Sequence, residues 1–227
     1  MTQELGRVER PFAASFRGKR KLFLVPRLYE PPDDVEEGIG ILEKYWMQVQ
    51  AQVESLESGL GPIKHIYHEG LTEGGENGLG YLENIDHRCH AFVYAKSQSG
   101  AILEATEDAE ILGETLDLQR CLMLHFTNNK VAMQIHDWFN DSVRRRYEHV
   151  SKRIDETLTE DGIALLIINE RHQVQFPDDV DVFFVAPPAL DEFRRWVDTW
   201  LAKQKSASVE NDLDSEPSSD HVSGSAG

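Results

Sequence analysis

Hydrophobic and polar positions in the second half of the chain follow two contrasting patterns. Residues 128–158 carry an apolar residue every three or four positions, which predicts a long amphipathic helix. Two continuous apolar runs follow, Ile-Ala-Leu-Leu-Ile-Ile at residues 163–168 and Val-Phe-Phe-Val-Ala at residues 182–186. Continuous runs are typical of strands buried on both faces, as in a parallel sheet between helical layers. We therefore expect both strands to lie inside the molecule, before a last helix that begins at Pro188.

The first half of the chain also alternates strand and helix. Residues 22–25 predict a strand, residues 34–58 a helix with one apolar stripe, and residues 63–67 a second strand. A strand, a helix and a strand in this order fit a right-handed crossover between parallel strands. Further helices are predicted from about Asn77 to Phe92, over residues 110–123, and after an Asn128 cap. The run at residues 101–105 fits strand or helix, and we interpret it as a helix.

These elements predict one α/β domain over residues 20–205. We expect about four strands in a mainly parallel sheet, with helices on both faces. Residues 1–19 are predicted to form a flexible basic head. Residues 206–227 are rich in Ser, Asp, Glu and Gly, and this composition predicts a disordered acidic tail.

The net charge of −17 limits the classes of molecule that the chain is expected to bind. The tail holds five acidic and no basic residues, which leaves 35 acidic against 23 basic residues before it. Such a surface repels polyanions and argues against broad DNA binding, although a local basic patch can contact RNA. No apolar run approaches the ~20 residues of a membrane helix, and the start of the chain does not resemble a secretory signal. We expect a cytoplasmic protein without membrane association, and Cys89 and Cys121 as free, partly buried thiols.

Candidate chemical groups lie at the end of the second predicted strand. Ligand sites in open parallel sheets lie beyond the carboxyl ends of the strands, which favours His68 and Glu69. With Glu104 and Glu107 of a later acidic run, they are the candidate catalytic residues, although such runs are more often solvated helix faces. His65 and His68 are candidate metal ligands, but residues three apart on a strand point to opposite faces. We therefore predict no metal site.

Basic residues form a second candidate site on the long helix. Arg145 and Lys152 lie seven residues apart, on one side of the helix, and are candidates for binding phosphate or RNA. The alternative is that these cations pair with the surplus carboxylates of the chain. The glycine-rich segment 70–80 lacks both the GxGxxG and the GxxxxGK[ST] fingerprints. No GxSxG nucleophile elbow occurs, and no cofactor is predicted.

One stretch resembles a known family. Tyr147-Glu148-His149-Val150 leads through Ile154-Asp155-Glu156-Thr157-Leu158 to the two apolar runs and to Pro187-Pro188-Ala189-Leu190-Asp191. This layout, about a quarter of the chain, resembles the later, L7Ae-like domains of archaeo-eukaryotic peptide chain release factors and their bacterial relatives. The resemblance implies an α/β sandwich and a module associated with RNA or the ribosome. The catalytic Gly-Gly-Gln of that family is missing, because Gly74-Gly75 is followed by Glu76, so peptidyl-tRNA hydrolysis is not implied.

The sequence thus leaves three hypotheses. The first is a noncatalytic cytoplasmic binding or adaptor module, which the resemblance links to RNA or the translation machinery. The second is a small hydrolase or metal-dependent enzyme. The third is self-association through the last helix, which carries Trp196 and Trp200; no oligomeric state is predicted. The enzyme requires a shared pocket for five side chains: His65, His68, Glu69, Glu104 and Glu107.

Overall fold

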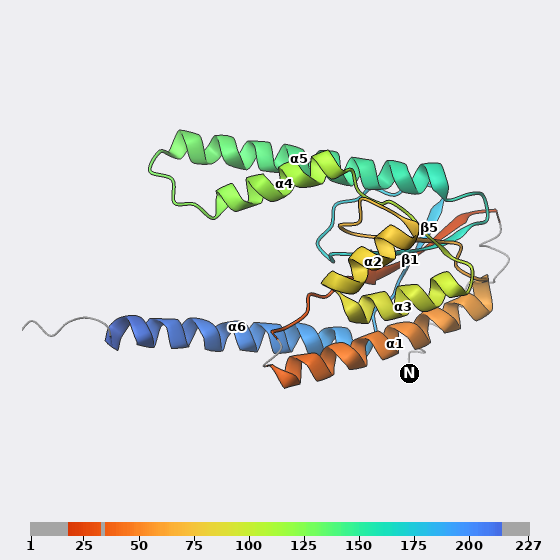
Figure 1. Cartoon of the computed structure of the whole chain (residues 1–227), viewed down its shortest axis with the longest axis horizontal. Helices are drawn as coiled ribbons and strands as arrows, with labels where there is room; N and C mark the ends of the chain where they lie inside the picture. Colours follow the sequence, from red (N-terminus) through yellow and green to blue (C-terminus); the bar gives the residue numbers. More distant parts are fainter. Residues whose placement is uncertain (1–17, 33–34, 215–227) are drawn as a thin grey trace, which may run out of the picture.

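The computed structural model describes residues 18–32 and 35–214, with side chains up to residue 206. Its centre is a sheet with helices around it (Figure 1). The sheet has five parallel strands in the order β3-β2-β4-β1-β5. The strands are β1 (Arg20–Pro26), β2 (His65–His68), β3 (Ile102–Leu103), β4 (Ile163–Ile168) and β5 (Val180–Phe184). The predicted α/β class with a parallel sheet is confirmed, with one strand more than expected.

Six helices accompany the sheet in the part of the chain that the structure describes. They are α1 (Glu36–Leu60), α2 (Gly75–Ile85), α3 (His87–Gln98), α4 (Ala109–Leu122), α5 (Asn129–Thr157) and α6 (Pro188–Asp214). The predicted cap of the long helix is confirmed, because the Asn128 side chain accepts hydrogen bonds from the backbone of Lys130 and Val131. Residues 1–17 of the predicted head and residues 215–227 of the predicted tail lie outside the described ranges.

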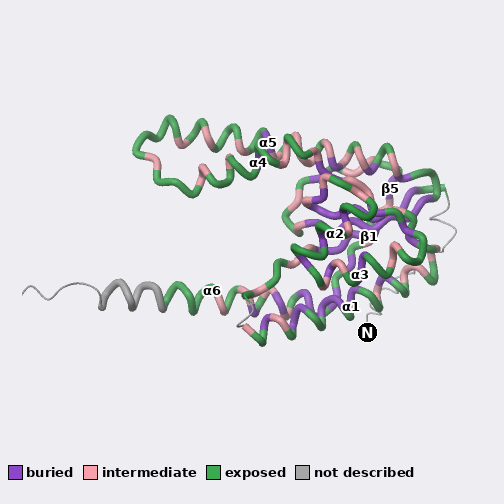
Figure 2. The backbone as a smooth tube through the Cα atoms, in the orientation of Figure 1, coloured by how far each residue is buried: buried purple, intermediate pink, exposed green. Residues whose placement is uncertain are grey.

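Helices cover both faces of the sheet, as predicted. On one face, apolar side chains of α1, α2, α3 and α6 pack against Phe23, Ile66 and Leu165. On the other face, the carboxyl-terminal half of α5 packs against Leu22 and Leu166. Figure 2 shows the buried positions concentrated along the sheet and the helices that touch it. Because β1 and β4 lie between two helical layers, their apolar runs are continuous.

Two predicted elements differ from those in the structure. Ile102 and Leu103 form a strand and not a helix, because the Ile102 amide bonds the Lys64 carbonyl and the Glu104 amide bonds the Ile66 carbonyl. A two-residue strand is too short to show a sequence period. The helix predicted from Asn77 to Phe92 is divided at Asp86, whose carboxylate accepts a hydrogen bond from the Cys89 amide and caps α3.

The expectation that both apolar runs lie inside is confirmed for β4 and wrong for β5. Every residue of β4 is buried. In β5, Val182 is 42% exposed and Phe184 is 48% exposed. This strand pairs with β1 alone and forms an edge of the sheet. Phe183 points the other way and meets the Phe23 ring edge-on at 5.9 Å. On the face of Val182 and Phe184, Val180 is the buried residue of β5.

Two long helical segments extend away from the sheet. The amino-terminal half of α5 lies beside α4 and forms a helical hairpin with it (Figure 1). On the opposite side of the molecule, α6 continues to Asp214, beyond residue 205, where the sequence analysis placed the start of the tail. No Pro or Gly occurs between residues 189 and 214 to end this helix.

The contact between α1 and α6 depends on the absence of one side chain. A Cβ atom at Gly38 would lie 2.4 Å from two ring atoms of Trp196, whereas a Cβ atom at Gly40 would meet nothing within 4 Å. We expect Gly38→Ala to lower the free energy of unfolding by about 1–3 kcal/mol through overpacking. In contrast, Gly40→Ala should raise it by about 0.5–1 kcal/mol through helix propensity. Urea unfolding of both variants tests this, and equal stability of the two would contradict the close packing.

Candidate functional site

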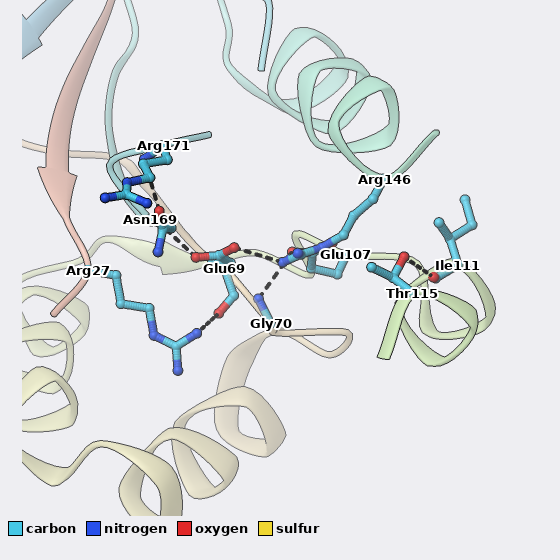
Figure 3. Close-up of polar contacts among 9 residues, drawn as sticks. All are labelled: Arg27, Glu69, Gly70, Glu107, Ile111, Thr115, Arg146, Asn169 and Arg171. Carbon is cyan, nitrogen blue, oxygen red and sulfur yellow. Dashed lines mark hydrogen bonds and ion pairs between the residues drawn. The ribbon is translucent and has the colours of Figure 1, made fainter. Parts of the chain in front are cut away.

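The carboxyl ends of three strands bring polar residues together. The strands β1, β2 and β4 end at Pro26, His68 and Ile168, and the next residues are Arg27, Glu69 and Asn169. Arg27 Nη1 donates to the Glu69 backbone oxygen at 3.2 Å, and the Asn169 amide donates to Glu69 Oε2 at 2.8 Å (Figure 3). Glu69 therefore links the ends of all three strands.

A buried ion triad connects this edge of the sheet to α5. Arg146 reaches from α5 between two carboxylates (Figure 3). Its Nη2 lies 3.0 Å from Glu69 Oε1, and its Nε lies 2.9 Å from Glu107 Oε2. Glu107 Oε1 also accepts a hydrogen bond from the Gly70 amide at 3.2 Å. The geometry is that of a planar guanidinium held by two acceptors.

Burial makes the triad strongly interdependent. The side chains of Arg146, Glu69 and Glu107 are 13%, 6% and 1% exposed. Burial alone would lower the pKa of Arg146, but the hydrogen bonds and charge of Glu107 outweigh burial and raise it. The two carboxylates therefore act as counterions of Arg146. In this arrangement, Glu69 and Glu107 fix α5 to the sheet.

A cleft of about 390 Å³ lies beside the triad. Residues from the ends of β1 and β2 and from α2, α4 and α5 line it, including Arg27, Glu69, Tyr81, Leu112, Leu116 and Arg146. Tyr81 and Leu116 are 53% and 44% exposed. The cleft is at the carboxyl edge, where the sequence analysis expected a ligand, but most of its apolar lining belongs to α2 and α4.

The five side chains required by the enzyme hypothesis lie in three separate groups. His65 Nδ1 contacts Glu104 Oε1 at 2.8 Å, beside the Tyr67 ring. Glu69 and Glu107 belong to the triad. His68 is fully buried on the opposite face of β2 from His65, as expected for positions three apart. Across residues 18–32 and 35–206, no hydrogen bond or ion pair joins these side-chain groups to one another.

His68 instead lies near two residues that the sequence analysis did not combine with it. Ligand atoms of His68, Asp86 and Cys89 all lie within 4.8 Å of one another, and all three residues are buried. Neither ring nitrogen of His68 has a hydrogen-bond partner among the described residues. Burial lowers the pKa of His68 to about 3, and the charge of Arg27 acts in the same direction. In the sequence, the signal for this group of residues was the spacing of Asp86 and Cys89, which lie three positions apart at the start of α3.

The candidate phosphate ligands on α5 are engaged with carboxylates. Arg145 contacts Glu114 of α4 at 2.6 Å and Asp141 at 3.0 Å. Lys152 lies 3.7 Å from Glu156 and lines a groove between α5 and residues 173–177. The basic residues near the start of β1 are paired as well, since Arg20 contacts Asp155 and Asp179, and Lys19 contacts Asp181. The structure does not bring Arg145 and Lys152 together around one open site.

The helical hairpin carries a different surface, part of which belongs to the apolar stripe predicted for the long helix. The predicted apolar seam of α5 is buried at Val150 and Ile154 but exposed nearer the start of the helix. We call the exposed apolar residues around the end of the hairpin the hairpin tip. It consists of Met123 (77% exposed), Leu124 (63%), Val131 (47%), Met133 (67%) and Trp138 (52%).

Comparison with protein-family models, with curated proteins and with solved structures finds no match to this chain. Among the helices that the structure describes, none is both long and apolar enough to cross a membrane. The function must therefore be argued from the geometry of the chain itself.

The ion triad allows a direct test of how α5 is held. Arg146→Met leaves two buried carboxylates without their counterion, so we expect the free energy of unfolding to fall by about 3–5 kcal/mol. Arg144→Met is the matched control, because Arg144 is 58% exposed and pairs with the exposed Asp141 and Glu148. The free energy of unfolding of Arg144→Met should lie within about 1 kcal/mol of the wild-type value. Urea unfolding measures both, and equal losses would show that the triad does not anchor the helix.

Proposed function

We propose that this chain is a noncatalytic binding module whose α4–α5 hairpin contacts a protein partner through the hairpin tip. The proposal rests on the exposure of Met123, Leu124, Met133 and Trp138. These residues belong to the α4–α5 hairpin, which extends from the sheet and is called the arm below (Figure 1). Large exposed apolar side chains that gather at one end of a domain mark a candidate site of interaction.

In the part of the chain that the structure describes, no third element covers the apolar residues of the arm. In α4, Thr115 is the one residue that is buried, and in α5 no residue before Ser142 is buried. An amphipathic helix gains stability by burying its apolar stripe, and two helices side by side cover only part of each stripe. A partner helix or groove against the hairpin tip would supply the missing cover.

The charge of the arm supports a protein partner over a nucleic acid. Residues 116–138 contain two acidic residues, Asp117 and Asp137, and two basic residues, Arg120 and Lys130. This segment is therefore neutral, on a chain of net charge −17. Nucleic-acid binding depends on several cations placed along phosphates, whereas the central part of a protein interface is poor in charge and rich in aromatic and methionine side chains.

The base of the arm is fixed, which favours binding. Arg146 ties α5 to Glu69 and Glu107, and Arg145 ties it to Glu114 of α4. The hairpin tip is therefore presented on two helices that are held where they join the sheet. A surface ordered before binding loses less conformational freedom when the partner arrives.

The association with RNA or the ribosome remains a prediction from the family resemblance. The arginines of α5 pair with carboxylates, so a contact with a ribosomal protein agrees better with this surface than a contact with RNA. Among the described residues, the contacts of His65, His68, Glu69, Glu104 and Glu107 fall into three separate groups, which does not favour the enzyme alternative. A cytoplasmic location also remains a prediction.

Site-specific crosslinking tests the proposal. A photo-crosslinking amino acid replaces Met123 or Met133 in the full chain, within the cells that naturally produce it. Met47 on α1 is the matched control, because it is 67% exposed, as Met133 is. We expect a discrete protein adduct from positions 123 and 133 and none from position 47, because the arm alone is proposed to bind.

The outcome separates the partner classes. The adduct should also disappear when Leu124→Glu is added, because a charge in an apolar interface costs desolvation energy. An adduct that ribonuclease removes would replace the protein partner with RNA. Equal labelling from positions 47 and 123, or no adduct from the arm, would overturn the proposal.

A further inference from the structure

We infer that His68, Asp86 and Cys89 form a buried site for one zinc-like divalent cation. The three residues come from the end of β2, the break between α2 and α3, and the first turn of α3. Their ligand atoms lie within 4.8 Å of one another, and imidazole nitrogen, carboxylate oxygen and thiolate sulfur are ligands that Zn²⁺ accepts. This site is separate from the hairpin tip.

The His68 side chain is the independent sign of a missing ligand. It is fully buried, yet neither Nδ1 nor Nε2 has a partner in the part of the chain that the structure describes. A buried polar group without a partner costs free energy, and such a group in a native fold calls for a water or an ion. Asp86 and Cys89 are the ligand-bearing side chains that lie beside it.

Charge balance favours a divalent cation in this position. A thiolate and a carboxylate together cancel the two charges of the ion, and His68 binds as the neutral imidazole. Binding transfers the thiol proton of Cys89, and any proton on Asp86, to solvent. Three protein ligands leave one position of a four-ligand zinc site for a water or hydroxide. Arg27 carries a positive charge nearby, which acts against the cation, and the two anionic ligands must outweigh it.

The ligand types also select the metal. Thiolate and imidazole favour Zn²⁺ and Co²⁺, whereas Mg²⁺ and Ca²⁺ require oxygen ligands. Asp86, Cys89 and His68 are 4%, 0% and 0% exposed, and the site is therefore closed. Because the ion would join side chains from β2, from the break between α2 and α3, and from α3, it would stabilise the junction of these elements.

Cobalt titration of the full chain, after removal of metal by chelator, tests the site. We expect one Co²⁺ per chain and a thiolate-to-cobalt absorption band in the near ultraviolet. Cys121→Ser is the matched control, because Cys121 lies on α4 outside the site and should leave the band unchanged. Cys89→Ser should abolish the band. No band in the wild-type chain, or an unchanged band in Cys89→Ser, would overturn the inference.

A second variant keeps the test valid if Cys89→Ser does not fold. Asp86→Asn retains an oxygen that caps α3 but loses the charge that binds the ion. Zinc at a hundredfold excess over its Kd should raise the wild-type Tm by about 5–10 °C. Asp86→Asn should require at least about tenfold more zinc for the same shift. The same zinc dependence in both proteins, or no zinc effect on the wild-type Tm, would contradict the site.

Discussion

The fold depends on one buried guanidinium. Arg146 lies between Glu69 at the end of β2 and Glu107 before α4, so a single side chain connects the sheet, the hairpin and the loop between them. Once these groups are removed from water, none of the three can lose its partners without leaving an unpaired buried charge. This requirement fixes the position of α5 along the sheet. The exposed half of the helix is thereby directed away from the domain.

Strong periodicity made most of the fold predictable from sequence. The α5 cap at Asn128, the stripe of α1 and the buried run of β4 are local signals, because each is formed by residues close together in the chain. The two strands that were misjudged depend on distant neighbours. β3 exists through pairing with β2, and β5 is an edge strand because β1 is its one neighbour in the sheet. An apolar run alone does not show how many neighbours the strand will have.

The position of the candidate site was predictable from the sequence, but the partners of its side chains were not. The strand-end rule located Glu69 correctly, at the edge where β1, β2 and β4 finish. The partner of Glu69 was not predictable, because Arg146 follows it by 77 positions and is one of three adjacent arginines that point in different directions. In the same way, His68 and Cys89 are 21 positions apart, and only the fold places them together with Asp86.

The two proposed sites lie at different distances from the sheet, and this explains their different character. Groups at the strand ends are enclosed by helices on both faces, so polar side chains there must be neutralised by each other or by an ion. Within the described ranges, no sheet lies beneath the hairpin tip, and its apolar residues remain exposed. A buried cation near α3 would stiffen the body of the domain, whereas the proposed partner would bind on the arm. The triad at Arg146 and the packing of Val150 and Ile154 join the arm to the body of the domain.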